Sequence, residues 1–221
     1  SATPMRTVFP PWSDTAFRVV LVVGALAATA AVIGPMIYVR TPYHQGREYP
    51  LDQPVQFDHR HHVRDDGIDC LYCHGGARKS AFAGIPATEV CMGCHAQVWP
   101  DSIQLEMVRR SFFAGEPLRW SRVHRLPDYV YFNHAAHVNK GIGCVSCHGR
   151  VDQMALDYQV APLSMGWCLD CHRAPEPNLR PLTQVTSMTW QPPPGQRDAL
   201  GKKLAAAYQI HHMTSCTTCH R

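Results

Sequence analysis

All ten cysteines of the chain lie in five Cys-x-x-Cys-His motifs. The thiols are those of Cys70, Cys73, Cys91, Cys94, Cys144, Cys147, Cys168, Cys171, Cys216 and Cys219, and the motif histidines are His74, His95, His148, His172 and His220. On one helical turn, positions i, i+3 and i+4 share a face, so both thiols and the imidazole can approach one group together. This is the attachment signature of c-type haem, in which two thiols bind the porphyrin and the histidine binds the iron. The motifs therefore predict five covalently bound haem c groups.

Two other chemistries also use paired cysteines. Ten cysteines are enough for five disulfides, and Cys-x-x-Cys pairs can hold structural zinc. Neither of these needs a histidine directly after every second cysteine. Because the chain has only 14 histidines in 221 residues, five such placements favour haem over both alternatives.

Two segments of the chain repeat one pattern. They are "FDHRHHVRDDGIDCLYCHGG" at Phe57–Gly76, the first repeat, and "FNHAAHVNKGIGCVSCHG" at Phe132–Gly149, the second repeat. Both read Phe-x-His-x-x-His-Val and then Gly-Ile-x-Cys-x-x-Cys-His-Gly, and a further motif follows each, at Cys91 and Cys168. The pattern predicts a duplicated two-haem unit, with the fifth haem alone at the C-terminus.

The Phe-x-His-x-x-His pairs are candidates for second axial ligands of the irons. The two histidines of a pair are one helical turn apart and can point at two different irons; the alternative is that one of them binds a haem propionate. The predicted ligands are His59, His62, His134 and His137. We expect no ligand role for His61, because the second repeat has Ala136 at that position.

The remaining iron has several candidate partners, of which His124 is favoured. His212 and His211 compete with it, although His212 is four residues before Cys216, too close to fold over its own haem. A methionine would raise the potential of that haem, whereas methionines also fill gaps against apolar surfaces. The methionines near motifs are Met92, Met154, Met165, Met188 and Met213.

Composition indicates how the chain is built around these residues. It has 18 prolines and 15 glycines and few long periodic segments, so we expect a mostly α protein with much irregular structure, wrapped around five haems. The formal charge of +4 would fall to about −6 with ten ionised propionates, so the basic composition does not argue for nucleic acid binding.

The stretch Val19–Val39 contains 21 residues without a charge and is bracketed by Arg18 and Arg40. At about 1.5 Å per residue, a helix of this length spans roughly 30 Å, the thickness of a bilayer core. The apolar region of a cleaved signal peptide is usually shorter. We therefore predict a single-pass anchor in the cytoplasmic membrane. Flanking arginines do not set its orientation, but bacteria attach haem covalently on the outer side, so residues 41–221 are expected there.

The expected organisation has six parts. They are an N-terminal cytoplasmic segment (1–18), the anchor (19–39), a linker (40–56), the first two-haem unit (57–115), the second two-haem unit (116–182) and a C-terminal segment with the fifth haem (183–221). The proline-rich residues 174–195 are expected to run extended over the surface. Residues 197–212 have a helical composition.

The Phe-x-His-x-x-His segments before Cys-x-x-Cys-His resemble class III multihaem cytochromes c. Together with the anchor, "RVHRLPDYVYFNHAAHVNKGIGCVSCHG", "LSMGWCLDCHR" and the C-terminal motif, they resemble the pentahaem membrane-anchored subunit of alternative complex III. That resemblance covers most of the chain, and the family comprises bacterial quinol:electron-acceptor oxidoreductases. It implies three kinds of partner: an iron–sulfur-type subunit, integral quinol-oxidising subunits and a monohaem cytochrome c. It also implies that electrons pass along the outer face towards a periplasmic acceptor or terminal oxidase, in respiration or photosynthesis.

Two rival functions fit parts of the sequence. A membrane-anchored multihaem quinol dehydrogenase that feeds a periplasmic reductase fits the anchor but not the twin repeats. A multihaem nitrite or hydroxylamine reductase needs an iron with an open position. Nine histidines outside the motifs and no Cys-x-x-Cys-Lys variant favour six-coordinate irons instead. The sequence therefore predicts an electron-transfer subunit without substrate chemistry of its own.

Overall fold

The computed structural model describes residues 8–220; the first seven residues of the predicted N-terminal segment, and Arg221, lie outside the described residues. Across residues 8–220 the chain is helical or irregular and has no β-strand, only two isolated bridges, Arg47 with Gln159 and Ile142 with Leu179. The predicted mostly α and irregular class is confirmed. The chain divides into two units, Ser1–Gly46 and Arg47–Arg221.

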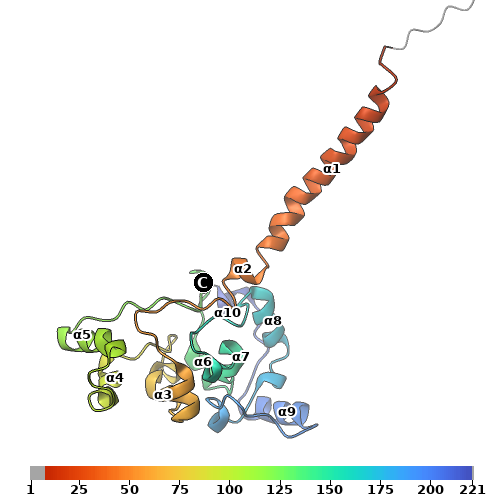
Figure 1. Ribbon diagram of the computed structural model, residues 1–221. Helices are drawn as coiled ribbons and strands as arrows, with labels where there is room; N and C mark the ends of the chain where they lie inside the picture. Colours follow the sequence, from red (N-terminus) through yellow and green to blue (C-terminus); the bar gives the residue numbers. More distant parts are fainter. Residues whose placement is uncertain (1–7, 221) are drawn as a thin grey trace, which may run out of the picture. The chain divides into compact units, whose positions relative to one another are not determined.

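The first unit contains the long helix α1 (Ser13–Tyr38) and the short helix α2 (Pro42–Gln45) (Figure 1). Helix α1 has 26 residues with a mean hydropathy of 2.3, and none of its residues is buried within the protein. It covers the predicted span except Val39, and it continues through Pro35, which membrane helices tolerate. Its length and composition fit a single-pass anchor.

The second unit consists of short helices joined by irregular chain (Figure 1). Those that carry the motifs are α3 (Cys70–Cys73), α4 (Thr88–His95), α7 (Cys144–His148), α8 (Met165–Arg173) and α10 (Cys216–Cys219). The other α-helices are α5 (Glu106–Ala114), α6 (His134–Val138) and α9 (Arg197–Ala207). The 3-10 helices are η2 (Gly75–Arg78), η3 (Ile103–Leu105), η4 (Val151–Gln153), η5 (Glu176–Asn178) and η6 (Leu182–Gln184), and η1 (Arg60–Asp65) is a π-helix.

Side-chain caps set where several of these helices begin. Asp69 accepts a hydrogen bond from the Leu71 N–H at the start of α3, and Ser164 accepts one from the Trp167 N–H at the start of α8. Such caps satisfy main-chain donors that have no partner inside the helix. Helices this short are not stable in isolation, so they depend on the packing around them.

The apolar core of the second unit is small. One cluster joins Val55, Leu105 and Val108, and another is formed by Ala77, Val138 and Val185. Both clusters lie beside motif cysteines, since Cys91 packs on the first and Cys144 on the second. A core of this size is expected if bound cofactors supply the remaining apolar mass.

The two repeats pack against each other reciprocally. Helix α6 of the second repeat contacts η2 of the first, and η1 of the first repeat contacts η4, which directly follows the second. Main-chain hydrogen bonds from His134 N–H to the Ala81 carbonyl and from Ala135 N–H to the Ser80 carbonyl, each 3.1 Å, hold one of these contacts. Each histidine pair is thereby placed beside the chain that follows the other repeat's motif.

The prediction for the proline-rich residues 174–195 is wrong. Instead of running extended over the surface, this segment forms η5 and η6 and buries Leu179, Val185 and Met188. Proline fixes φ near −65° and suits the first position of a helical turn, so the prolines set up short turns that direct these side chains inward. The following helix, α9, is shorter than the helical composition suggested and ends at Ala207.

Candidate haem-binding sites

The motif side chains lie as one-turn units. All ten thiols are free, and hydrogen bonds such as His74 N–H to the Cys70 carbonyl (2.8 Å) and His220 N–H to the Cys216 carbonyl (2.9 Å) close the turn. The two thiols and the following imidazole are thus held by one short stretch of backbone. This local geometry fits the covalent attachment of a porphyrin through its two vinyl groups.

Four of the five motif histidines use Nδ1 to contact a main-chain carbonyl. The contacts are His74 to Gly84 (2.7 Å), His95 to Val98 (3.0 Å), His172 to Met213 (2.9 Å) and His220 to Tyr129 (3.0 Å). A carbonyl only accepts, so Nδ1 donates and Nε2 keeps a free lone pair for a metal. The fifth, His148, is held neutral because burial lowers its pKa to about 3, and a metal needs the neutral ring.

The histidines predicted as second axial ligands show the same arrangement. Nδ1 contacts the Asp58 carbonyl in His62 (3.1 Å), the Ala81 carbonyl in His134 (2.8 Å) and the Asn133 carbonyl in His137 (2.8 Å). In His59 it faces a carboxylate instead, with Asp157 Oδ1 at 3.1 Å. All four rings therefore leave Nε2 available.

Three of these rings lie opposite motif histidines. The ring centroids are 6.1 Å apart for His62 and His95, 6.0 Å for His137 and His172, and 6.4 Å for His134 and His148. Two imidazoles that flank one iron, with metal–nitrogen bonds of about 2 Å, would have centroids roughly 6 Å apart. His134 and His137, neighbours on one turn, approach different motif histidines, which fits the prediction that each pair serves two irons.

His124 lies in the same region, with its ring centroid 4.3 Å from that of His148. This distance is too short for two rings that flank one iron. Burial lowers the pKa of His124, and its Nε2 is buried without a hydrogen-bond partner. A buried nitrogen without a partner is costly and has the lone pair that an iron would take, so His124 remains a predicted ligand without an assigned haem.

Two other histidines lie close to carboxylates. In His61, Nδ1 is 3.2 Å from Asp65 Oδ2, whereas Nε2 is 3.9 Å from Asp58 Oδ2, beyond hydrogen-bond distance, so the absence of a ligand role for His61 stays a prediction. In His212, Nε2 is 3.3 Å from Glu176 Oε1. That contact makes His212 a weaker candidate than His124 for the unassigned position.

Motif thiols also lie close to thiols of other motifs. A hydrogen bond with the Cys144 thiol raises the pKa of Cys70, so the first and third motifs meet at their first cysteines. Burial and the nearby Cys94 raise the pKa of Cys73. The second motif is thereby placed beside the first.

Similar contacts between thiols link the third motif to the fourth, and the fourth to the fifth. Burial raises the pKa of Cys147 to about 12, and the nearby Cys171 contributes to the shift. Burial and the nearby Cys219 raise the pKa of Cys168. The motifs therefore form a row whose order is second, first, third, fourth and fifth, which differs from their order in the sequence.

Phe57 and Phe132 contribute to the site, although the sequence analysis gave them no role. Phe57 stacks on His62 at 4.3 Å, and Phe132 stacks on His137 at 4.5 Å, each with 28° between the ring planes. The sequence did contain a signal for these two residues, because a phenylalanine begins both repeats. Asp157, which faces His59, was also missed, and no sequence pattern pointed to it.

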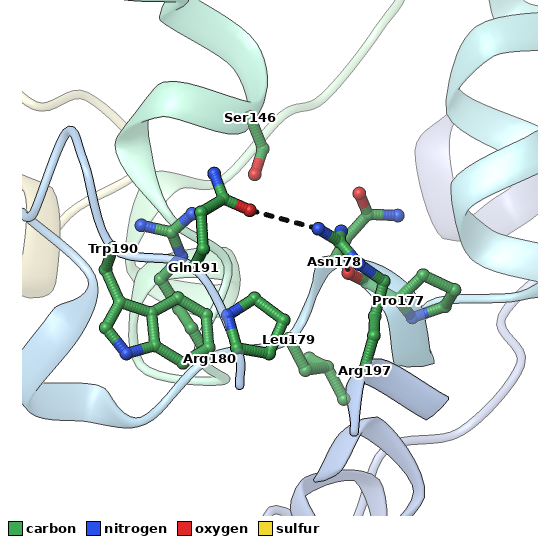
Figure 2. Close-up of a pocket in the computed structure, with 9 residues that line it drawn as sticks. Ser146, Pro177, Asn178, Leu179, Arg180, Trp190, Gln191 and Arg197 are labelled. Atoms are coloured by element: carbon green, nitrogen blue, oxygen red, sulfur yellow. Dashed lines mark hydrogen bonds between the residues drawn. The ribbon is translucent and has the colours of Figure 1, made fainter. Parts of the chain in front are cut away.

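A small pocket lies beside the third motif (Figure 2). Its wall includes Ser146 and two arginines, Arg180 and Arg197; Arg197 donates a 3.0 Å hydrogen bond to Gln191 Oε1. Arg180 is buried and lies over the Trp190 ring, 5.2 Å from its centroid. The cavity volume of about 100 Å³ holds a few water molecules and is too small for a porphyrin.

No protein-family model matches the chain. Over 98 residues, the chain is 37% identical to a protein of Nitratidesulfovibrio vulgaris (strain Hildenborough) named "Menaquinone reductase, multiheme cytochrome c subunit". The match covers 44% of this chain and 46% of the relative, so the chain spans about half the length of the curated relative that it matches. In sequence as well as in its repeated motifs, the chain is therefore similar to a multihaem cytochrome c.

Proposed function

We propose that this chain is a membrane-anchored cytochrome c with five haem c groups, and that it carries electrons within a membrane complex that reacts with a quinone. The observation that carries the proposal is the row of five Cys-x-x-Cys-His motifs, in which most motif histidines have Nδ1 engaged and Nε2 free. The similarity to a subunit named for menaquinone reduction supports the link to a quinone.

The chain's own residues have three tasks in this proposal. The ten cysteines attach the haems, and the motif histidines bind the irons on one side. His59, His62, His134, His137 and His124 bind on the other. When bound, the haems supply reversible one-electron transfer. The Nδ1 contacts fix each imidazole before it meets iron, and full six-coordination leaves no position for a substrate.

The identity of the complex is a finer proposal. The combination of anchor, repeats and C-terminal motif resembles the pentahaem subunit of alternative complex III, whose partners would be an iron–sulfur subunit, integral quinol-oxidising subunits and a monohaem cytochrome c. The name of the relative favours a second candidate, a complex that reduces menaquinone. In the first case electrons leave the quinol, and in the second they reach the quinone.

The location follows from the anchor and from haem attachment. Helix α1 would cross the cytoplasmic membrane once, and the haem-binding unit would lie on the periplasmic side, where bacteria attach haem to thiols. Deletion of residues 1–40, with export restored by a cleavable signal, should release a soluble haem-loaded protein. A truncated protein that still pellets with membranes after partner subunits are removed would argue against a single anchor.

The haem count tests the core of the proposal. Mass spectrometry of the denatured protein should show the 24.7 kDa chain plus five haem masses, because thioether bonds survive denaturation. A mass near that of the bare chain would contradict the proposal, and an increase of four haem masses would contradict the count.

The direction of electron flow separates the two candidate complexes. The purified complex is mixed with menaquinol, and haem absorption is recorded. Alternative complex III predicts rapid haem reduction by menaquinol. A menaquinone-reducing complex predicts that its prereduced haems are rapidly oxidised by menaquinone. If the intact complex shows neither of these reactions, the link to a quinone is contradicted.

A further inference from the structure

We propose that Asp157 is a positioning residue for His59, and that its carboxylate lowers the reduction potential of the haem that His59 serves. The inference rests on the proposed function, because it requires His59 to be an iron ligand. It assigns a role to a residue outside every motif and outside both repeats.

The contact joins two buried atoms that lack other partners. His59 Nδ1 and Asp157 Oδ1 are 3.1 Å apart, and neither has another hydrogen-bond partner among the described residues. Their side chains are 18% and 28% exposed. The ring N–H does not point straight at the oxygen in this geometry, so the pair is a close contact between two atoms that otherwise have no partner. Since a buried polar atom without a partner is costly, each of these atoms is the natural partner of the other.

The chain around Asp157 is held in place. Its carbonyl accepts from the Leu51 N–H at 3.4 Å. Two residues later, the buried Gln159 accepts from the Glu48 N–H (2.9 Å) and the Arg125 N–H (3.2 Å) and donates to the Ala161 carbonyl (3.0 Å). These bonds hold the main chain at Asp157 and at Gln159. The held main chain therefore keeps the Asp157 carboxylate within reach of the His59 ring.

The acceptor distinguishes His59 from the other predicted ligands. His62, His134 and His137 each place Nδ1 against a neutral main-chain carbonyl. An ionised carboxylate is a stronger acceptor than a carbonyl. It draws the Nδ1 proton further from the ring, which makes the Nε2 lone pair more basic. His59 is therefore the most electron-donating of these four ligands.

A more electron-donating ligand stabilises ferric iron over ferrous iron, and hydrogen bonding beyond the ligand is one of the protein's means of setting a haem potential. The negative charge of Asp157 acts in the same direction, because reduction removes one positive charge from the iron. Both effects lower the potential of the haem bound by His59. Loss of the carboxylate should reverse both.

The test compares Asp157→Asn with Asp157→Glu in the full-length protein. In Asp157→Asn, the one-electron reduction equilibrium of the haem bound by His59 should change about tenfold, which raises its potential by 59 mV. A haem bound by His124, which also lies within the influence of the Asp157 charge, should shift less, and the other three should stay close to their original potentials. The ferric electron paramagnetic resonance signal of the haem bound by His59 should move too, since it senses the ligand's basicity. Asp157→Glu should restore most of both shifts because it keeps the carboxylate.

Asp58→Asn is the matched control. It removes one carboxylate next to His59 in sequence, but that carboxylate binds the Arg60 guanidinium, with the closest atoms 2.6 Å apart, and does not contact the His59 ring. It should leave the resonance signal unchanged and shift the potential less than Asp157→Asn does. Equal shifts in the two variants would overturn the positioning role, because they would reduce the effect to general charge.

The failures of the two proposals are distinguishable. Five attached haems with an unshifted Asp157→Asn variant would overturn the role of Asp157 and leave the proposed function intact. If His59→Met also fails to move any haem potential, the assignment of His59 as a ligand falls, and the role of Asp157 falls with it. A wild-type chain without attached haem would overturn both proposals.

Discussion

The two repeats have nearly the same local geometry. The first histidine of each pair meets its phenylalanine edge-on at 4.8 Å, with ring planes 82° apart for Phe57 and His59 and 87° apart for Phe132 and His134. The second histidine lies about as far from the histidine of the motif that follows its repeat, at 6.1 Å for His62 and His95 and 6.0 Å for His137 and His172. A shared sequence pattern has thus produced the same ring arrangement twice.

The differences arise where each repeat meets the rest of the unit. The histidine pair lies at a π-helix, η1, in the first repeat and on an α-helix, α6, in the second. His59 faces the Asp157 carboxylate, whereas His134 faces the Ala81 carbonyl. The local sequence therefore determines how the rings are arranged within each repeat, and segments distant in the sequence determine the charges and acceptors around them.

A further difference lies just before the first cysteine of each motif. Asp69 in the first repeat caps α3 and accepts from the Thr186 hydroxyl at 2.7 Å. The second repeat has Gly143 there, and the Arg180 side chain fills the space that a side chain at position 143 would take. Positions 186 and 180 belong to the same proline-rich segment, which meets the two repeats in different ways.

The largest expected effect tests the similarity of the second histidines. His62→Met and His137→Met should each raise the potential of one haem by about 100-fold in the reduction equilibrium, roughly 120 mV, because a thioether favours ferrous iron. The two variants should affect different haems in redox titrations. His61→Met is the control and should shift none. If both variants move the same haem, the repeats are not equivalent.

Within the second repeat, His134→Met and His137→Met should shift different haems by a similar amount, since the two rings approach different motif histidines. Spectra and redox titrations of both variants measure this. A shift of the same haem in both, or of none, would mean that the pair packs against the haems and does not bind two irons.

Gly143→Ala should destabilise the protein by about 1–3 kcal/mol, the usual cost of overpacking. A Cβ at this position would lie 2.5 Å from Arg180 Cζ, and buried Arg180 is held by hydrogen bonds to the Gln184 and Ser187 carbonyls. Denaturant unfolding measures the change. Gly166→Ala, where a Cβ has open space, is the control and should have little effect.

Asp69→Ala should destabilise the first repeat by about 1 kcal/mol, the typical cost of losing a helix cap. The change also removes the hydrogen bond from Thr186. Thermal unfolding of the haem-loaded protein measures the loss. Asp69→Asn keeps a capping oxygen and should recover most of it; equal losses in both variants would contradict a capping role.

The smallest effect concerns the Asp58–Arg60 pair of the first repeat, which the second replaces with Asn133 and Ala135. A hydrogen bond from Arg60 lowers the pKa of Asp58 to about 2. The contribution of this pair to the stability of the folded protein is fully present above the ordinary pKa of 3.8 and is lost as the pH falls through about 2. Because the Arg60 and Asp58 side chains are still 40% and 20% exposed, solvent screens the pair, and the effect should stay below about 1 kcal/mol. Acid titration of wild type against Asp58→Asn measures it; identical curves would show that the pair contributes nothing.

The sequence by itself determined the local parts of this protein. Cysteine and histidine spacing places three side chains on one turn, and the structure has short helices at all five motifs. The repeated Gly67 and Gly141 both adopt positive φ, +68° and +82°, a conformation that glycine tolerates. The apolar run Val19–Val39 lies, except for Val39, within the long helix α1. These features follow from spacing, backbone freedom and hydrophobicity over a few turns.

The tertiary structure determined which motifs and which distant segments of the chain are neighbours. The first motif meets the third at Cys70 and Cys144 and the second at Cys73 and Cys94, so the row of motifs does not follow chain order. Asp157 reaches His59 across almost a hundred residues, and the proline-rich segment turns inward to bury Val185. Spacing along the chain constrains only neighbours on one turn, whereas contacts between distant segments depend on how the whole unit packs.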